Sequence, residues 1–452
     1  MNETRYLSKF IYQLSYEDLP SEVIEKCKTM VMDTIGCAIA VGKIDKQKEK
    51  IALNIARQFN TKPDATVIKG GFKSHFFYAA MANSLLSHSL DYDDTNKKSL
   101  IHTGAILVPT GLAIAESEKR TGKEFITSIV AGYEACVRIG MCVMPSHYNF
   151  WHSTATNGTF GSGTVAAKIM DLNVNQIQNC LGMCGTQAAG LVTFFEYGDY
   201  TKTLHAGKAS LNGILSAFLS KMDATAPPTI LEHEKGFSSA FSENPQLEKI
   251  TDGLGTKWEI LNNAIKPYPS ILASHSAIEA TLNCIQDNNI SYHDIYKIVL
   301  RTYDTVVTHF SNYNIGESSM AARLSVPYCI AIAAIDGVVG NEQFTFQRIK
   351  SNEIINMLKK VEIVSDPNLT RMYPKKFPAA VSIITKNGRK FEETVHYSKG
   401  DNNNPIALKE IENKFSLNAK DRLTSEQIIT FLDKIHNLEN LASLDEIGNI
   451  IN

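Results

Sequence analysis

The chain has 452 residues, of which 44% are hydrophobic and 20% are charged, and its formal net charge is -2. This length exceeds what one ordinary hydrophobic core holds, so we expect two domains or three, and the balanced charge offers no basic surface for nucleic acid. The first twenty residues lack the blocks of a signal peptide, and no apolar run approaches the ~18 residues of a membrane span, which together predict a cytoplasmic protein that binds no membrane.

Apolar residues recur mainly at helical spacing from the start to about residue 225, so we expect this half of the chain to be all-helical. The first clear helix opens at Pro20-Ser21 and closes at Gly42. Further helices are expected at about residues 77–92, 104–120, 123–143, 158–170, 174–190 and 204–222.

The character of the sequence changes after about residue 260. Strands are expected at 295–303, 360–364, 380–386 and 390–396, and helices at about 274–287, 318–336, 352–359, 406–415 and 424–436. Asn387-Gly388 lies between the last two strands and predicts a tight hairpin. We therefore predict a mainly α fold: a large all-helical domain (1–265), a smaller α+β lid domain (266–405), and C-terminal helices (406–452) that pack back on the first domain.

The eight cysteines are scattered among apolar neighbours, without a CxxC pair. Neither a zinc ribbon nor a ferredoxin-type cluster fits this spacing. Cys180 and Cys184 lie one helical turn apart, but such pairs are more often small core residues than metal ligands. Buried, reduced thiols are therefore the expectation.

The densest polar segment of the helical half reads SHSLDYDDT. If the helix continues through it, His88, Asp91 and Thr95 lie on one face, and Asp94 lies three residues beyond Asp91. A solvated helix end with capping aspartates is the plain interpretation. Two functional interpretations compete with it, because unpaired buried carboxylates are rare: a magnesium-diphosphate site like that of all-helical isoprenoid synthases, or acid–base chemistry with His102 just downstream.

His102 precedes Thr103-Gly104, an apparent helix start, and a helix N-terminus favours anions. Such a histidine is more often a capping or surface residue, but its closeness to the aspartates favours a place beside a substrate carboxylate. His152 lies in FWHSTATNGTFGSG, where a partly desolvated imidazole can change its protonation state. No strand precedes the glycines of this segment, so close helix packing explains them better than a phosphate loop.

Two further segments carry cationic and imidazole side chains. FFEYGDYTKTLHAGK places Lys202, His205 and Lys208 at the start of a helix, where lysine can bind substrate carboxylates, although Lys208 is more simply a solvated residue. KPYPSILASH joins the two expected domains and delivers His275 at a helix start. A histidine at a domain junction can enter a cleft between the domains, where ligand sites are common.

In their order and spacing these segments resemble the MmgE/PrpD family, which includes 2-methylcitrate dehydratase, cis-aconitate decarboxylase and iminodisuccinate epimerase. The resemblance covers nearly the whole chain and rests on the blocks SHSLDYDDT, the helix start at His102, WHSTATNGTFG, GTQAAGL, YTKTLHAGKA, KPYPSILASH, ARLSVPYCIA and YSKGDNNNP. It implies a large helical domain, a smaller α+β lid, an active site between them and a homodimer.

Carried over by motif, the resemblance implies the active-site residues Asp91, Thr95, His102, His152, Lys202 and His275, with Lys266 and Arg323 as weaker candidates for carboxylate binding. The chain departs from the family pattern between Thr95 and His102. Its loop there reads Asn-Lys-Lys-Ser-Leu-Ile, whereas many relatives have a shorter loop that contains histidine and proline. His102 is also followed by Thr-Gly instead of the usual proline. We expect this loop to contact the substrate.

The resemblance implies a lyase for a small di- or tricarboxylic acid that needs no metal and no other cofactor, and a 2-methylcitrate dehydratase-like hydro-lyase is our first choice. Dehydration beside a carboxylate needs a base, an acid and cations that stabilise the developing aci-carboxylate. We assign proton transfer to His102 and His152, and carboxylate binding to Lys202 and His275. Asp91 would orient a histidine or hydroxyl, and Thr95 would bond to the substrate.

Several alternatives stay open. Within the family they are a cis-aconitate decarboxylase-like carboxy-lyase and an epimerase of an imino- or hydroxy-dicarboxylate. Outside it, a magnesium-dependent all-helical synthase would use Asp91, Asp93 and Asp94, but the sequence lacks a second Asp-rich motif and gives the α+β domain no role. A non-catalytic binding protein is the third class, and the full set of histidine, lysine and aspartate residues argues against it.

Overall fold

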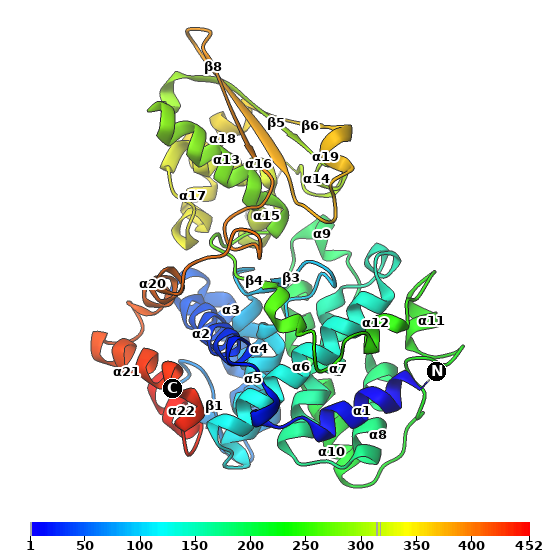
Figure 1. Cartoon of the computed structure of the whole chain (residues 1–452). Coiled ribbons are helices and arrows are strands. Elements are labelled where there is room, and N and C mark those ends of the chain that lie inside the picture. The colour runs from blue at the N-terminus through cyan, green and yellow to red at the C-terminus, as the bar shows by residue number, and fades with distance from the viewer. Residues whose placement is uncertain (1, 313–314, 317) are drawn as a thin grey trace.

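The computed structural model describes residues 2–312, 315, 316 and 318–452. It consists of a helical part below and an α+β part above, joined by two passages of the chain (Figure 1). One buried core contains residues from the first 265 positions together with residues 411–451, and two further cores lie within residues 273–395. We propose that this separation of cores marks the two domains expected from the sequence.

Long helices form most of the helical part: α1 (Glu3–Gln13), α2 (Ser21–Ile44), α3 (Lys46–Gln58), α4 (Phe76–His88), α5 (Gly104–Ser117), α6 (Gly122–Val143), α7 (Ser153–Ile169), α8 (Val174–Gln187) and α10 (Thr201–Lys221). The short elements are α9 (Phe194–Tyr197), α11 (Phe237–Phe241), α12 (Glu248–Thr251), β1 (Ala65–Thr66), β2 (Lys73–Ser74), β3 (Thr95–Asn96) and β4 (Asn263–Ala264). The four two-residue strands were not expected in an all-helical domain.

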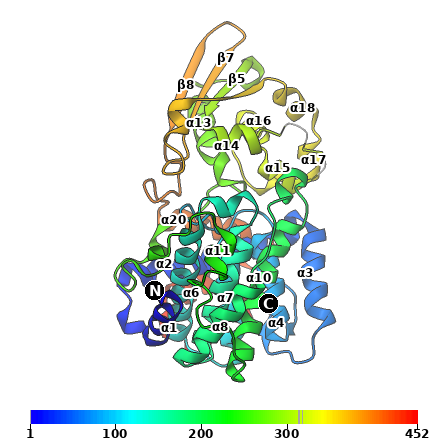
Figure 2. The ribbon, with the colours of Figure 1, turned by 90° about the vertical axis from the view of Figure 1, so that its right-hand side faces the viewer.

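Helix α7 lies in the middle of the helical part and contacts α5, α6, α8 and α10 (Figure 2). Its glycines allow this close packing. A methyl group on Gly158 would lie 2.2 Å from Cδ1 of Ile106, and one on Gly163 would lie 2.4 Å from Sγ of Cys184. The glycines of this segment therefore serve helix packing, as the sequence analysis favoured.

The α+β part contains one four-stranded sheet in the order β6-β5-β7-β8. Its strands are β5 (Ile295–Thr302), β6 (Val361–Ser365), β7 (Ala379–Thr385) and β8 (Lys390–Val395). Strands β5 and β6 are parallel and the other pairs antiparallel. The hairpin between β7 and β8 turns at Asn387-Gly388, and Gly388 has a φ of 84°, which is why glycine suits this position.

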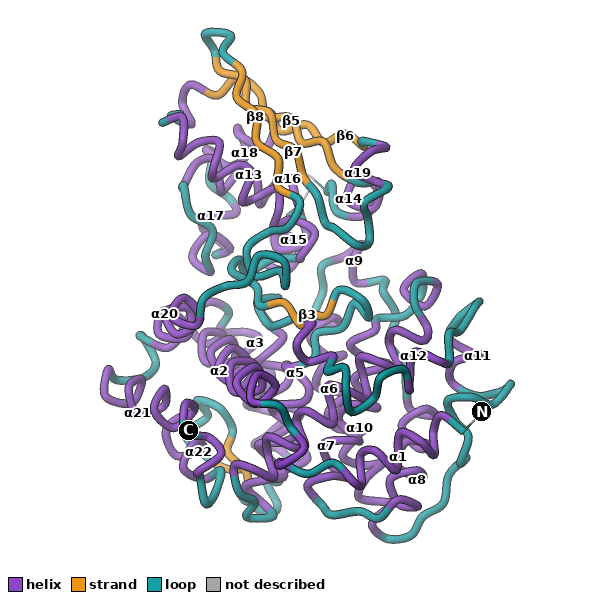
Figure 3. Tube along the Cα trace, in the orientation of Figure 1, coloured by secondary structure: helices purple, strands orange, loops and turns teal. Residues whose placement is uncertain are grey.

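Helices cover this sheet: α13 (Leu272–Asn288) packs on β7 and β8, and α16 (Val326–Asp336) packs on α13 and β6. The remaining helices of this part are α14 (Asp304–His309), α15 (Ser319–Leu324), α17 (Phe346–Ile349), α18 (Asn352–Leu358) and α19 (Pro367–Thr370). Figure 3 shows that the strands of this sheet lie far from β3, which is at the junction with the helical part.

The C-terminal helices return to the helical part (Figure 1). They are α20 (Leu408–Ala419), α21 (Ser425–His436) and α22 (Asp445–Ile451), and both α20 and α21 contact α2. A buried ion pair of 2.6 Å between Lys414 and Asp33 joins α20 to α2. Lys414 also donates a hydrogen bond of 2.8 Å to the carbonyl of Tyr92, in the loop after α4.

The mainly α fold with a smaller α+β part is confirmed. Among the described residues, α6 is long and apolar enough to cross a membrane, a feature that the sequence analysis did not recognise. Most of this helix is buried inside the molecule, against α5, α7 and other elements.

Candidate active site

The SHSLDYDDT segment is not one continuous helix. Helix α4 ends at His88, Asp91 has a φ of 49°, and Thr95 begins strand β3. The expectation that His88, Asp91 and Thr95 share one helix face is therefore wrong. The three aspartates are also not a solvated helix end, because all are at most 1% exposed. The left-handed residue Asp91 lies in the loop after the helix end, and this loop turns the carboxylates inward.

Strand β3 places this loop beside a segment far along the chain. Thr95 pairs with Ala264, and Asn96 pairs with Asn263. This antiparallel contact brings Lys266, three residues beyond Asn263, to the buried carboxylate of Asp91. The pairing of two-residue strands thus joins two of the sequence blocks that carry the resemblance.

Asp91 binds two lysines through one carboxylate oxygen. Its Oδ1 lies 2.6 Å from Nζ of Lys266 and 2.9 Å from Nζ of Lys202, and all three side chains are nearly inaccessible. Burial would raise the pKa of Asp91, but the charges of Lys202 and Lys266 outweigh it and hold the pKa well below its usual range. Two ammonium groups and one carboxylate leave a net positive charge, which favours an anionic ligand nearby.

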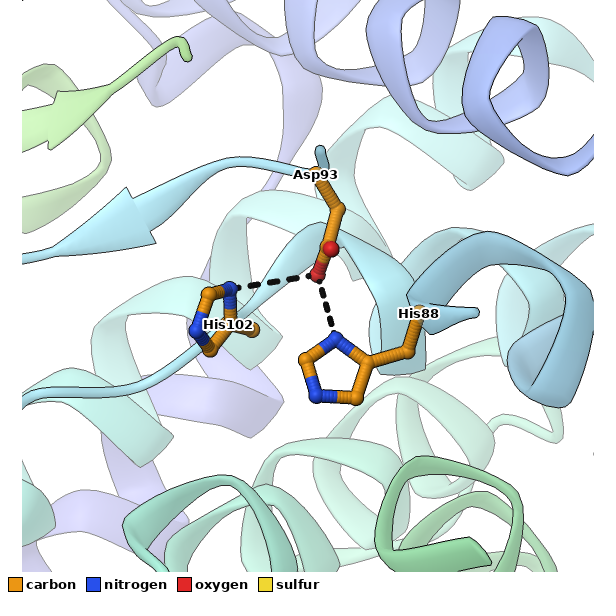
Figure 4. Close-up of side chains that lie close together, drawn as sticks. All are labelled: His88, Asp93 and His102. Carbon is orange, nitrogen blue, oxygen red and sulfur yellow. Dashed lines mark hydrogen bonds and ion pairs between the residues drawn. The ribbon is translucent and has the colours of Figure 1, made fainter. Parts of the chain in front are cut away.

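Asp93 lies between two imidazoles (Figure 4). Its Oδ2 is 2.9 Å from Nδ1 of His88 and 3.3 Å from Nδ1 of His102. Nδ1 of His102 also lies 3.1 Å from the carbonyl of Asp94. Because carbonyl and carboxylate oxygens only accept, Nδ1 of His102 carries the proton. Nε2 is then the nitrogen that can exchange a proton, and it lies 3.7 Å from Oδ1 of Asp91.

The side chain of Asp94 holds the loop after α4 to three other segments of the helical part. It accepts hydrogen bonds from the backbone of Gly104, the hydroxyl of Tyr133 and the amide of Asn263, at 2.7–2.9 Å. Burial and the charge of Asp93 raise the pKa of Asp94 to about 7. These bonds fix the start of α5 to the turn that holds His102.

His152 is the residue before α7, and its ring contacts a second imidazole at the start of α10. Nδ1 of His152 lies 2.9 Å from Nδ1 of His205. One of these nitrogens must donate and the other accept, so the tautomer of His205 determines the tautomer of His152. The ring of His88 stacks on His152 at 6.1 Å and contacts His102 at 4.7 Å, so four imidazoles form one continuous group.

His275 lies in the first turn of α13 and is fully buried. Its Nε2 donates to the carbonyl of Ser270 at 3.2 Å, and its Nδ1 has no hydrogen-bond partner among the described residues. Burial and the charge of Lys266 lower the pKa of His275 to about 3. Its Nδ1 is therefore an unused acceptor, but the side chain is fully buried and does not line the cavity between the two parts.

Arg323 is buried in α15 and supports backbone instead of facing a cavity. It donates to the carbonyls of Leu90 at 2.9 Å and Pro269 at 2.6 Å, and its guanidinium lies over the ring of Phe344. With these partners it holds the loop after α4 against the junction. We therefore assign Arg323 a positioning role and propose no contact with a carboxylate.

Burial lowers the pKa of each imidazole in this group and so favours its neutral form. Burial is the largest cause in each case: it lowers the pKa of His88 and His205 to about 4 and that of His152 well below the usual range. Burial also lowers the pKa of His102, and Lys266 and Lys202 add to this, while Asp93 opposes it. A bound polycarboxylate would raise these pKa values, so binding and proton uptake are coupled.

A cavity of about 700 Å³ lies between the helical and α+β parts. Thr95, Leu100 and His102 line it from the loop around β3, and residues of α14 and the loop before β7 line it from the α+β part. Of the loop that departs from the family pattern, Leu100 faces this cavity, whereas Lys97 pairs with Asp401 and Lys98 with Glu259. The substrate contact expected of this loop stays a prediction, and Leu100 is the residue of residues 96–101 that lines the cavity.

One group of described residues could hold a metal ion: His88, Asp93 and His102, whose ligand atoms lie within 4.8 Å of one another. Two imidazoles and one carboxylate are a set that binds first-row transition metals. The same atoms also satisfy one another by hydrogen bonds, and Asp91 and Asp94, which the magnesium alternative requires, are engaged elsewhere.

The structure brings most of the expected site residues together. Asp91, Lys202, Lys266 and His102 are linked by contacts, His152 joins them through His88, and Thr95 lies with His102 at the cavity. His88 and His205 were not assigned roles from the sequence, and Asp93 was assigned one only in the magnesium alternative. All three lie within the blocks that carry the resemblance, but their spacing alone gave no sign of the pairings.

The MmgE/PrpD N-terminal domain matches residues 5–250, and the C-terminal domain of the same family matches residues 268–438. The chain belongs to the MmgE/PrpD family. The C-terminal match extends through α20 and α21, which pack on α2 of the helical part.

Relatives within the MmgE/PrpD family include decarboxylases of animals and fungi. The chain is 25% identical to a cis-aconitate decarboxylase of Mus musculus, over 98% of the chain and 93% of that protein. It is 25% identical to the cis-aconitate decarboxylase of Homo sapiens, over 99% of the chain and 94% of that protein. It is 26% identical to a cis-aconitate decarboxylase of Aspergillus terreus, over 77% of the chain and 75% of that protein. The chain is therefore a lyase of this family.

Proposed function

We propose that the protein is a carboxy-lyase that acts on cis-aconitate or a closely similar acid, and that it needs no metal. The observation that carries this proposal is the position of His102 at the cavity. One ring nitrogen of His102 is fixed by acceptors, and the other is free beside the positively charged group of Asp91, Lys202 and Lys266.

Decarboxylation of cis-aconitate breaks the bond between the methylene carbon and its carboxylate. The electron pair moves through the allylic system to the vinylic carbon, where the adjacent carboxylate takes up charge as an aci-carboxylate. Carbon dioxide leaves as the first bond breaks, and an imidazolium then delivers a proton to the vinylic carbon. This sequence needs one acid and a cationic group near the developing charge, and neither role requires a cofactor.

The residues divide these roles by position. His102 lies at the cavity and would protonate the carbon, with Asp93 holding its Nδ1. The excess positive charge of Lys202 and Lys266 would bind the carboxylate that takes up charge. Thr95 lies beside His102 and would bond to a second carboxylate, while His152 and His275 offer further nitrogens for proton transfer and orientation.

The first choice from the sequence, a 2-methylcitrate dehydratase-like hydro-lyase, has less support than its alternative. The relatives named above are decarboxylases. Dehydration would use the same histidines as base and acid, and an epimerase would use them on both faces of one carbon. The difference among the three reactions therefore lies in the substrate and in which nitrogen is protonated when it binds.

A panel of acids separates these reactions. Purified protein, treated with EDTA, is incubated with cis-aconitate, citrate, 2-methylcitrate and iminodisuccinate, and the products are identified by mass. We expect carbon dioxide to be lost from cis-aconitate at the highest kcat/KM. Loss of water from 2-methylcitrate as the preferred reaction would refute the decarboxylase assignment, and activity that returns only with magnesium or iron would refute the metal-free assignment.

A further inference from the structure

The cavity beside His102 has an aromatic wall. Phe195 from α9 contacts Tyr148 at 6.0 Å and Phe310 at 5.4 Å, so rings of the helical and α+β parts meet there. Tyr303 and Tyr373 stack at 4.6 Å on the side of the α+β part, and Phe377 closes the group edge-on. Each ring is supported by another, so the wall is preformed.

This cavity carries little positive charge. Among the described residues that line it, none is lysine or arginine, and the ionisable groups apart from tyrosines are His102, Glu196 and His309. The lysines of the site, Lys202 and Lys266, are almost inaccessible and bound to Asp91. A ligand with carboxylates along its whole length would therefore meet no lysine or arginine side chain among the described residues that line this cavity.

The wall also contains a buried donor without a partner. Tyr303 is 1% exposed, and its hydroxyl has no hydrogen-bond partner among the described residues. Leaving such a group unsatisfied is costly, so a ligand or a water is expected to reach it. This hydroxyl is thus a hydrogen-bonding position, independent of the ring contacts, that a ligand or a water in the cavity can fill.

Size leads to the same conclusion. A volume of about 700 Å³ lies within the range of pockets that enclose a drug-sized ligand, and an unsubstituted small polycarboxylic acid would leave much of it unfilled. The space that remains lies along Phe195, Phe310 and Leu272, where apolar atoms gain most from leaving water.

We propose that this cavity is a subsite for an apolar substituent, and that the preferred substrate is an unsaturated polycarboxylic acid with an alkyl or aryl group on the carbon that loses carbon dioxide. This inference rests on the proposed function for the reaction at His102, but adds the class of substrate. The carboxylates lie at the end near His102 and Thr95, and the substituent lies between Phe195 and the rings of Tyr303 and Tyr373.

A homologous series tests the proposal. cis-Aconitates that carry hydrogen, methyl, propyl, pentyl or benzyl on the methylene carbon are compared by kcat/KM, and the affinity of each is measured by calorimetry. We expect kcat/KM and affinity to rise by about threefold to fourfold for each methylene until the cavity is filled, the ratio typical of burying a methylene group. A flat or falling dependence of both quantities on chain length would overturn the subsite.

A pair of variants locates the effect. Phe195→Ala removes the ring that joins the two sides of the wall and should flatten the dependence on chain length. Tyr296→Ala removes an aromatic ring that is 66% exposed and does not line the cavity, so its dependence should match that of the unmodified protein. An equal dependence in Phe195→Ala and Tyr296→Ala would contradict the placement of the substituent.

Affinities measured by calorimetry distinguish failure of the proposed decarboxylation from failure of the proposed subsite. If no acid of the series reacts but affinity still rises with chain length, the proposed reaction is wrong and the subsite stands. If cis-aconitate is decarboxylated but neither affinity nor kcat/KM rises with chain length, the reaction stands and the subsite is wrong.

Discussion

At the scale of single residues, the site depends on how each imidazole is held. His102 has its Nδ1 fixed by Asp93 and the carbonyl of Asp94, whereas Nδ1 of His152 faces another histidine. The two residues are therefore different acids: the first is beside a carboxylate that stabilises the imidazolium, and the second is beside a ring that shares a proton.

We expect His102→Ala and His152→Ala each to lower kcat by roughly a hundredfold or more, the usual scale for a general acid or base. Stability should change little for His102→Ala, because Asp93 keeps its bond to His88. His293→Ala, an exposed histidine, is the matched control. Normal turnover of both variants on the substrate, with unchanged melting temperatures, would show that neither residue transfers a proton.

Substitutions of His205 test whether this residue positions His152. The side-chain amide of an asparagine can occupy the position of Nδ1 of His205 and keep the hydrogen bond to His152, whereas a leucine side chain has no hydrogen-bonding atom. We expect His205→Leu to lower kcat by about tenfold, the effect of losing one strong hydrogen bond. His205→Asn should keep most of the kcat of the unmodified protein. The pH dependence of kcat should shift in His205→Leu only. Equal kcat values and equal pH profiles for the two variants would remove His205 from the positioning of His152.

The sequence blocks identify most residues of the site but not their partners. Asp91, His102 and Lys202 are found because the resemblance is carried by motif. The pairing of Lys266 with Asp91 depends on a two-residue strand contact, and that of His88 with Asp93 depends on a left-handed turn at Asp91. A strand of two residues and a single left-handed residue are both too short to produce a recognisable pattern in the sequence.

At the scale of elements, most of the long helices were predicted within a few residues, but α1 and α3 were not expected, whereas the short helix α18 was. The helix expected at 318–336 is two helices, α15 and α16, separated at Ser325. The side chain of Ser325 caps α16 by accepting from the backbone of Tyr328, and Pro327 lies in its first turn. Both residues are start signals, so a closer analysis of the sequence could have found this break.

A buried ion pair between Lys414 and Asp33 holds helix α20 against α2, and the carboxylate of Asp33 is fully buried. We expect Lys414→Met to lower the free energy of unfolding by about 3–5 kcal/mol, since it leaves Asp33 as an uncompensated buried charge. Urea denaturation measures this change, and Lys409→Met, 79% exposed in the same helix, is the control. Adding Asp33→Asn to Lys414→Met should recover part of the loss, and no recovery would mean that α20 is held chiefly by other contacts.

At the scale of the whole molecule, the homodimer implied by the family remains a prediction, and α10 presents a surface for it. Leu204, Leu211, Leu215, Phe218 and Met222 follow one another at helical spacing along its outer face. Four of them are among the large apolar side chains that are exposed. An apolar stripe of this kind is typical of a surface that is covered in the assembled protein.

We expect Phe218→Glu to convert the dimer to a monomer, because it places a charge in the middle of this stripe. Light scattering coupled to size-exclusion chromatography measures the mass. Phe346→Glu, which changes an exposed aromatic residue of the α+β part, should remain dimeric. A monomeric unmodified protein, or a dimer that persists in Phe218→Glu, would contradict this interface.

The resemblance implied an active site between the two domains, but the residues that line the cavity could not be predicted, because they come from segments about 280 residues apart that meet only in the folded chain. The sequence could place His275 at a junction and Thr95 near His102, but not the aromatic wall of the cavity. The size of the cavity, and the absence of lysine and arginine from its described lining residues, are properties of the assembled structure.

The central claim is that an imidazole at this cavity protonates carbon after carbon dioxide leaves, without a metal. The direct measurement is the reaction of EDTA-treated protein with cis-aconitate in deuterium oxide, followed by nuclear magnetic resonance and by the release of carbon dioxide. We predict one molecule of carbon dioxide per product and a single deuterium on the carbon that was vinylic. Gain or loss of water without carbon dioxide, or turnover that appears only after magnesium or iron is added, would contradict the claim.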